Sequence, residues 1–364
     1  RMTKSPAPAR LGSSPEQYRK LGISPDRIEP FEDGMRTDGR KGDFEWWYFD
    51  AHLDDGSKLV ITFYTKDCNQ TDTSLAPYAD IVLDRPDGTT INAKTSVFDG
   101  DGFSASTEQC DVKIGPNRFA GDLHTYTIHI ETDEITADVT LTGVVPAWRP
   151  RTGHFLFEED EHLYFAWLPS VPQGHVDATL HIGDEVVKAS GVGYHDHNWG
   201  NVSMMDVINN WYWGRGQAGP YTVIACYLTA EARYGFTELP IYMLAKNGTI
   251  IADDNTKVQF TPAESSHDPE TGKPVADLLT YSYTDGDTHD VITWRRHRTI
   301  LRDKFIDDIS GVKHFLAMLM GFDGAYLRFT GELSIERYED GVSVERAAGE
   351  AIWELMYFGK NHEA

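Results

Sequence analysis

Residues 191–201, GVGYHDHNWGN, place two histidines around an aspartate, between aromatic side chains and glycines. If this stretch is a strand, alternate side chains point to opposite faces. One face then carries Tyr194, Asp196 and Asn198, and the other carries His195, His197 and Trp199. An aspartic acid among aromatic rings can stay protonated at neutral pH and act as a general acid. The spacing therefore predicts Asp196 as a proton donor, with Tyr194, His195 and His197 tuning or orienting it.

Two other interpretations of this motif remain open. His195 and His197 form an H-x-H pair, but a metal needs a third and usually a fourth ligand, and the next acidic residue is Asp206. We therefore predict no metal. Alternatively, the motif is a hydrogen-bonded structural plug in which Gly193 and Gly200 serve turns.

A second cluster, FEWWYFDAH at 44–52, would place one carboxylate on each face of a strand: Glu45 with Trp47 and Phe49, and Asp50 with Trp46 and Tyr48. A buried carboxylate is costly unless it is paired or protonated. Either acid could be a reserve proton donor. Either could instead close the fold through an ion pair, with Arg215 or His52 as the expected partner.

Aromatic residues accompany both motifs, and the stretch NNWYWGRGQ at 209–217 adds more. Aromatic faces stabilise a carbocation by about 0.5–2 kcal/mol per ring, so protonation of an unactivated C=C bond, followed by addition of water, becomes feasible beside them. The row from Asn209 to Gln217 is either core or the wall of a cavity for a planar ligand. The predicted substrate-binding residues are Trp46, Trp47, Tyr48, Asp50, Trp199, Trp211, Trp213 and Arg215.

The elements that must position these residues are strands. β-rich stretches separated by Gly, Asn and Asp turns run through both halves of the chain, with hairpin turns predicted at 85–90 and at Asn247–Gly248. One short late helix is predicted at about 307–320. This pattern predicts an all-β protein of closed barrels or sandwiches. We expect an extended N-terminal arm at 1–42, one β-domain at 43–205 and a second at 206–364.

Composition excludes several classes of function. The 364 residues carry a net charge of −24, which disfavours binding to nucleic acid or anionic membrane. Glycine-rich nucleotide-binding motifs and a nucleophile elbow are missing, so no cofactor is expected. Cys68, Cys110 and Cys226 are predicted to be buried free thiols, although one Cys68–Cys110 bridge is possible. No apolar run is long enough to span a bilayer, so the sequence predicts a soluble cytoplasmic protein. We expect its partner to be a small hydrophobic substrate. The oligomeric state of the protein is left open.

The segments FEWWYFDAHLDDGSKLVITFYTKD and GVGYHDHNWGN, with AWLPSVPQGHVDATL and YLRFTGE more loosely, resemble a known superfamily. It is that of the carotenoid 1,2-hydratases (hydroxyneurosporene synthases) and AttH-like proteins, which includes kievitone hydratase-like enzymes and fungal Diels–Alderases that close decalin rings. The resemblance covers residues 40–358. It implies two tandem lipocalin-like barrels with a ligand cavity and cofactor-independent work on apolar substrates. It also implies that the Tyr194-x-Asp196 pair carries catalysis.

Three functions follow as hypotheses. The first is a cofactor-independent hydratase or cyclase that protonates a C=C bond of an isoprenoid or polyketide-type substrate. The second is a pericyclase that shapes a polyene for ring closure, in which no single acid is indispensable. The third is a non-catalytic carrier of hydrophobic small molecules.

Overall fold

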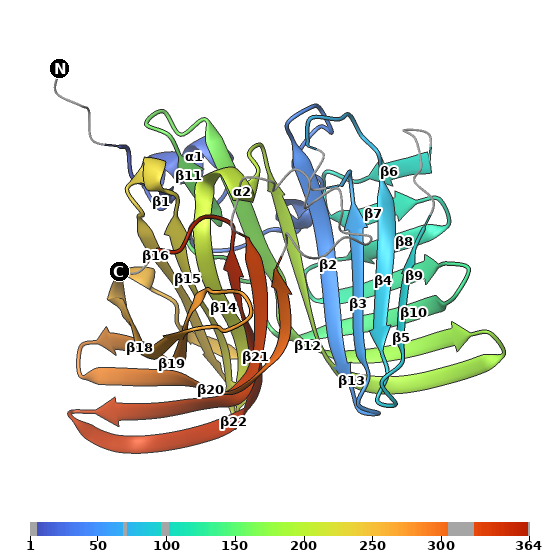
Figure 1. Ribbon diagram of the computed structural model, residues 1–364. Helices are drawn as coiled ribbons and strands as arrows, with labels where there is room; N and C mark the ends of the chain where they lie inside the picture. Colours follow the sequence, from blue (N-terminus) through green and yellow to red (C-terminus); the bar gives the residue numbers. More distant parts are fainter. Residues whose placement is uncertain (1–5, 68–70, 96–101, 305–323, 363–364) are drawn as a thin grey trace. The chain divides into compact units, whose positions relative to one another are not determined.

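The computed structural model describes residues 6–67, 71–95, 102–304 and 324–362. They form two compact units. The N-terminal unit comprises Leu11–Leu156 and Glu161–Ser203. The C-terminal unit comprises Met204–Ala364 together with Phe157–Asp160 and the start of the chain up to Arg10. Each unit is built on its own antiparallel sheet, which confirms the all-β prediction (Figure 1).

The sheet of the N-terminal unit has the strand order β5-β4-β3-β2-β13-β12-β10-β9-β8-β7-β6, with β1 and β11 attached beside β12. Apolar side chains from distant strands, such as Ile81 and Val112, belong to one core cluster. The sheet therefore curls around a single interior, as a lipocalin-like barrel does. The strands are β1 (Arg10–Leu11), β2 (Phe44–Leu53), β3 (Lys58–Tyr64), β4 (Tyr78–Asp84), β5 (Thr90–Lys94), β6 (Phe103–Ala105), β7 (Cys110–Ile114), β8 (Asn117–Gly121), β9 (Thr125–Glu131), β10 (Thr136–Val145), β11 (His154–Phe157), β12 (Leu163–Ile182) and β13 (Glu185–Gly200).

The sheet of the C-terminal unit has the order β17-β16-β15-β14-β22-β21-β20-β19-β18 and encloses a second apolar cluster. Its strands are β14 (Ile208–Ala218), β15 (Tyr221–Ala230), β16 (Glu238–Lys246), β17 (Thr249–Ala252), β18 (Val258–His267), β19 (Pro274–Asp285), β20 (Thr288–Lys304), β21 (Ala325–Glu339) and β22 (Val342–Tyr357). The predicted helix near 307–320 lies outside the described residues.

Short helices accompany the strands in both units. They are α1 (Pro15–Leu21), η1 (Pro30–Asp33), α2 (Met204–Val207), η3 (Ala232–Tyr234) and η4 (Asn255–Lys257). Ser14 begins α1 with a capping box, because its hydroxyl accepts from the Gln17 amide while the Gln17 side chain accepts from the Ser14 amide. No helix among the described residues is long and apolar enough to cross a bilayer.

Both predicted hairpin turns are confirmed. Residues 85–89 connect β4 to β5, and Gly88 has a φ of 88°. Asn247 and Gly248, with φ values of 50° and 82°, connect β16 to β17. Two successive positive φ values are what a type I′ turn requires, and Asn-Gly supplies them at low cost.

β12 is a long strand that runs without a break from Leu163 to Ile182, although it contains two prolines. Its pairing with β13 shifts register between Leu168 and Val171 and again between Val171 and Gly174. Pro169 and Pro172 lie at these shifts, because proline has no N–H to give to a regular ladder and is tolerated at bulges.

The close pairing of β13 with β2 gives a first testable prediction. A Cβ atom on Gly191 would lie 2.1 Å from the carbonyl oxygen of His52. We expect Gly191→Ala to lower the free energy of unfolding by about 1–3 kcal/mol, since the two strands would have to separate. The neighbouring Val192 is 47% exposed, so Val192→Ala should change it by less than about 0.5 kcal/mol. Urea unfolding of both variants checks the difference, and equal effects would contradict it.

Candidate active site

The two sequence motifs lie on paired strands. In the antiparallel register of β2 and β13, Tyr194 pairs with Asp50, Asp196 with Tyr48, and His197 with Trp47. Because Trp47 and Phe49 belong to the apolar core cluster, one side of this pair of strands faces the interior of the N-terminal unit. We call it the inner face, with Glu45, Trp47, His195, His197 and Trp199. The opposite side is the outer face, with Trp46, Tyr48, Asp50, Tyr194, Asp196 and Asn198.

On the outer face, three neutral groups hold Asp196. The hydroxyl of Tyr194 donates to Asp196 Oδ2 at 2.6 Å, and the indole N–H of Trp167 donates to the same oxygen at 3.0 Å. The side-chain amide of Asn198 donates to Oδ1 at 2.7 Å. Among the residues that the structure describes, the carboxyl group is therefore fixed without a cationic hydrogen-bond partner.

Burial of Asp196 raises its pKa above the ordinary carboxyl value. The bonds from Tyr194 and Trp167, the charge of His195 and the bond from Asn198 act in the opposite direction. Loss of hydration destabilises the charged form more than these neutral donors restore it. Since Oδ2 accepts two bonds and Oδ1 only one, a proton on Oδ1 leaves both bonds to Oδ2 intact.

Aromatic rings accompany Asp196 on the outer face. Tyr48 meets Tyr194 edge to face, with ring centroids 6.3 Å apart, and Trp148 meets Trp167 in the same way at 5.9 Å. The Tyr48 hydroxyl donates to Asp50 Oδ2 at 2.8 Å. Trp46 is half-buried and stacks on Phe44 with centroids 5.4 Å apart.

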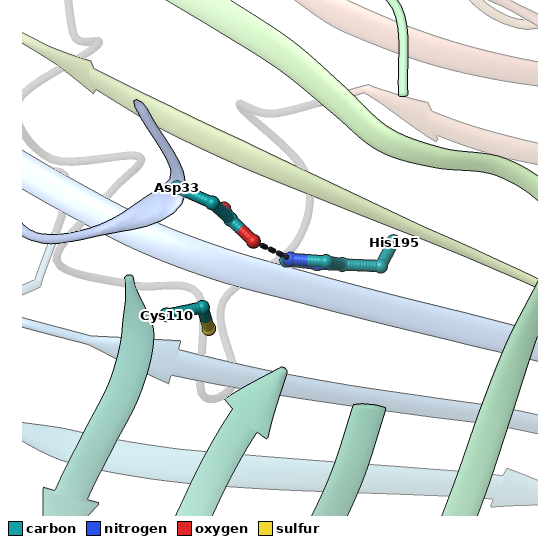
Figure 2. Close-up of side chains that lie close together, drawn as sticks. All are labelled: Asp33, Cys110 and His195. Atoms are coloured by element: carbon teal, nitrogen blue, oxygen red, sulfur yellow. Dashed lines mark hydrogen bonds and ion pairs between the residues drawn. The ribbon is translucent and has the colours of Figure 1, made fainter. Parts of the chain in front are cut away.

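On the inner face, His195 carries a proton on each ring nitrogen. Its Nε2 lies 2.9 Å from Asp33 Oδ2, and its Nδ1 lies 2.8 Å from the carbonyl oxygen of Tyr48. A carboxylate and a carbonyl can only accept, so both nitrogens must donate and the ring is an imidazolium. Burial alone would lower the His195 pKa, but the charge and hydrogen bond of Asp33 raise it. Figure 2 shows this ion pair beside Cys110.

Asp33 is the centre of the inner-face network. Burial alone would raise its pKa, but the charges of His195 and His197 and the bonds from His195 and Tyr126 bring it below the ordinary value. The Tyr126 hydroxyl donates to Oδ2 at 2.5 Å, and the indole N–H of Trp47 donates to the Asp33 carbonyl at 3.0 Å. The arm residue is thus held by the barrel interior.

His197 repeats the arrangement with Glu45. Its Nε2 lies 2.5 Å from Glu45 Oε2 and its Nδ1 lies 3.2 Å from the Glu32 carbonyl oxygen, so both nitrogens again face acceptors. Glu45 also accepts from the backbone amides of Arg36 and Thr37 and from the Thr37 hydroxyl. The His197 ring stacks on Trp47 at 4.8 Å and contacts Trp199 at 4.4 Å.

The ligand atoms of Asp33, Cys110 and His195 lie within 4.8 Å of one another, as in a potential metal site. A metal would require a deprotonated thiol and a ring nitrogen with a free lone pair. Burial raises the Cys110 pKa well above its ordinary value, and both nitrogens of His195 face acceptors. The donor set therefore fits an ion pair better than a metal ion. Cys110 and Cys226 are buried free thiols, whereas Cys68 lies outside the described residues.

Two sequence-based expectations need correction. Glu45 pairs with His197, not with Arg215 or His52 as expected. His195, His197 and Glu45 lie on the inner face, so they are not part of the hydrogen-bonded group around Asp196. His195 acts on Asp196 only through its charge. The alternation along the strand had already separated the faces, but it gave no sign that the histidines had their own acidic partners.

The third aromatic group belongs to the C-terminal unit. Tyr212 of β14 lies in the core cluster of that unit, while Trp211 and Trp213 point to the other side of the strand and are half-buried. The indole N–H of Trp211 donates to Glu354 at 3.3 Å, and the Arg215 guanidinium lies 5.7 Å from the Trp213 ring. Their role as a cavity wall stays a prediction.

Sequence reasoning missed residues of both networks, among them Asp33 and Trp167. Asp33 is 162 positions from His195 in the chain, and its only signal was an acidic pair, Glu32-Asp33, in an arm rich in basic residues and proline. Trp167 lies within the segment AWLPSVPQGHVDATL, where nothing in the local pattern marks it as part of a site. Its place opposite Asn198 in the β12–β13 pairing brings its indole to Asp196.

The chain is similar to several known proteins, in sequence or in fold. The chain is 24% identical over 325 residues to the quinolone epoxide rearrangement protein asqO of Emericella nidulans, covering 82% of this chain and 84% of that protein. It is 22% identical over 362 residues to the Diels-Alderase ucsH of an Acremonium species, covering 93% and 82%. Kievitone hydratase from Nectria haematococca has a similar fold, with a TM-score of 0.52 at 13% identity over 98% of each chain.

A family model described as Diels-Alderase-like matches residues 40–264, which include both motifs and the whole of β14. The resemblance inferred from the two motifs is confirmed by this match. The chain belongs to the Diels-Alderase-like family.

Proposed function

We propose that this protein is a cofactor-independent hydratase or cyclase that acts on an apolar isoprenoid or polyketide-type substrate. Asp196 is its proton donor, and the aromatic residues of the outer face steady the cationic carbon. The observation that carries the proposal is the buried carboxyl group of Asp196, held by three neutral donors, whose pKa is raised by burial.

In both reactions Asp196 donates one proton and later takes one back. The O–H of Asp196 gives its proton to one carbon of a C=C bond, a C–H bond forms, and the adjacent carbon becomes cationic. In hydration, water adds to that carbon and returns a proton to the Asp196 carboxylate. In cyclisation, a second C=C bond attacks the cation, and loss of a proton to Asp196 completes the ring. No oxidant or reductant is consumed.

Tyr194, Trp167 and Asn198 have a positioning role. Their donors fix the plane of the carboxyl group, and fixed orientation lowers the entropy cost of proton transfer. Tyr48 and Trp148 contact this group from the side. Electron-rich faces next to a developing cation stabilise it without acting as nucleophiles.

A labelling experiment tests the proposal. The protein is incubated in D₂O with a panel of acyclic isoprenoid and polyketide polyenes, and products are analysed by mass spectrometry and NMR. Protonation by Asp196 predicts one non-exchangeable deuterium on carbon in each product. Turnover that gives products without carbon-bound deuterium would overturn proton transfer, and binding without any turnover would support a carrier.

A pericyclase is the second candidate, and the comparisons favour it. The matched family and the relative ucsH carry the Diels-Alderase name. In a pericyclic reaction bonds form in concert, so the protein contributes shape and orientation. Such a reaction incorporates no solvent hydrogen, so the same D₂O experiment distinguishes it from hydration.

Tyr194→Phe gives a further prediction. The Tyr194 hydroxyl lowers the Asp196 pKa by stabilising the carboxylate, so its removal should raise that pKa. Because the protonated acid is the active form, the alkaline limb of the kcat/KM profile should move to higher pH. Tyr48→Phe, which removes the bond to Asp50 instead, is the matched control and should leave the limb in place. A shift to lower pH in Tyr194→Phe would contradict the assignment.

A further inference from the structure

The N-terminal unit contains a cavity of about 380 Å³ that is separate from the Asp196 group. It lies between arm residues 17–36 and the strands β11, β12 and β13, and we call it the arm cavity. Its apolar walls include Phe31, Leu168 and Trp199. Trp199 belongs to the inner face, and Leu168 pairs with His197, so the cavity lies on the other side of the sheet from Asp196.

His154, at the start of β11, is one of the residues that line this cavity. The side chain is only 7% exposed. Its Nδ1 lies 2.9 Å from the carbonyl oxygen of Thr152, so Nδ1 carries the hydrogen. Burial, with a smaller contribution from the charge of Arg149, lowers the His154 pKa to about 4. The ring is therefore neutral at pH 7, and Nε2, which has no hydrogen-bond partner among the described residues, carries a lone pair.

Two aromatic rings contact the His154 imidazole. The Tyr164 ring stacks on His154 with centroids 5.5 Å apart and planes 28° apart, and Trp199 meets the imidazole edge to face at 5.6 Å. Tyr164 also lines the cavity, and burial raises its pKa above the ordinary phenol value, so its hydroxyl stays protonated. A planar ligand can therefore lie against aromatic rings and find both an acceptor and a donor.

Arg149, which lines the cavity together with Lys20 and Arg36, has its donors already occupied. Arg149 Nε is paired with Glu32 at 2.8 Å, and its other donors reach the carbonyl oxygens of Arg151 and Ser24 at 2.8 Å each. The lone pair of His154 repels a carboxylate or phenolate. The acceptor is satisfied instead by a neutral O–H group.

The arm that closes the cavity is fixed in place before any ligand binds. Arg149 ties Glu32 and Ser24 to the barrel, and the Gly12 amide donates to the His154 carbonyl at 2.9 Å. A preformed site loses little entropy on binding. The geometry points to a second ligand site here: we propose that the arm cavity binds a small planar aromatic alcohol, whose hydroxyl donates to His154 Nε2 and whose ring lies against Trp199. This goes beyond the reaction proposed at Asp196 and does not depend on it.

The test compares two probes that share the naphthalene ring, 2-naphthol and its methyl ether 2-methoxynaphthalene, by calorimetry with the full-length protein. A neutral hydrogen bond predicts that 2-naphthol binds about 3- to 10-fold more tightly. His154→Phe keeps the stacked ring but removes the acceptor, so this preference should disappear while 2-methoxynaphthalene binds as before. His129→Phe, at a surface histidine, is the matched control and should keep the preference. Equal binding of both probes to the wild type, or a preserved preference in His154→Phe, would overturn the proposal.

Two further measurements keep the test decisive if His154→Phe does not fold. In the wild type, the ¹⁵N resonance of His154 Nε2 should shift more on addition of 2-naphthol than on addition of 2-methoxynaphthalene, which brings a ring to the same cavity but no donor; equal shifts overturn the proposal. Asp196→Asn should keep the preference for 2-naphthol, because it lies on the outer face. If Asp196→Asn abolishes that preference, the probe binds at the Asp196 group and the arm cavity is not its site.

Discussion

Asp196→Asn is expected to lower turnover by about 10²–10⁴-fold, the contribution typical of a positioned general acid. The amide has the shape of the acid but no proton to transfer to carbon. Tyr194 and Trp167 can still donate to the amide oxygen, and Asn198 needs only to rotate its own amide so that its oxygen accepts. Ligand affinity should therefore stay within about threefold of the wild type, since the exchange leaves shape and contacts intact.

Asp50→Asn is the comparison that makes this result specific. Asp50 lies on the same face and is held by the Tyr48 hydroxyl, so the two variants differ in which acid they remove. We expect Asp50→Asn to cost less than about tenfold in single-turnover assays. A large loss in Asp50→Asn with a mild loss in Asp196→Asn would move the acid to Asp50. Mild losses in both would favour catalysis by shape, as in a pericyclase.

Asp33→Asn is expected to lower the free energy of unfolding by about 3–5 kcal/mol, because it leaves the His195 imidazolium buried without its counter-charge. His195 is fully buried, and its Nε2–Asp33 bond lies inside the barrel. The surface pair of His129 and Asp138 provides a matched control. Its ring nitrogen and carboxylate are 2.7 Å apart, but the Asp138 side chain is exposed and that of His129 is only half-buried. Asp138→Asn should therefore cost less than about 1 kcal/mol, and urea unfolding measures both.

The same ion pair sets a pH window for stability. The pKa of Asp33 is lowered in the folded state, so its contribution is present above the ordinary carboxyl pKa and is lost as pH falls through the lowered value. The pKa of His195 is raised, so its contribution is complete below the ordinary imidazole pKa and is lost as pH rises through the raised value. Asp33→Asn should flatten both limbs. A variant with unchanged limbs would show that the pair does not control stability.

The alternation of side chains along the strands predicted the fold class and half of the candidate site. Period-two alternation placed Tyr194, Asp196 and Asn198 together, and the structure joins them through hydrogen bonds. Alternation acts within a strand and does not reveal which distant segment covers it. The partner of His195 comes from the arm, and that of Asp196 from β12, so both depended on tertiary packing.

Because β2 pairs with β13 residue by residue, the two motifs can only be kept or exchanged together. Moving β13 by a single position would send Asp196 into the barrel and His195 out of it, so the outer face would lose its acid and the inner face its cation. A chimaera that grafts only one of these strands from a relative should therefore fail unless the relative keeps the same alternation. Grafting both strands together transfers the acid and the charged pair behind it as a unit.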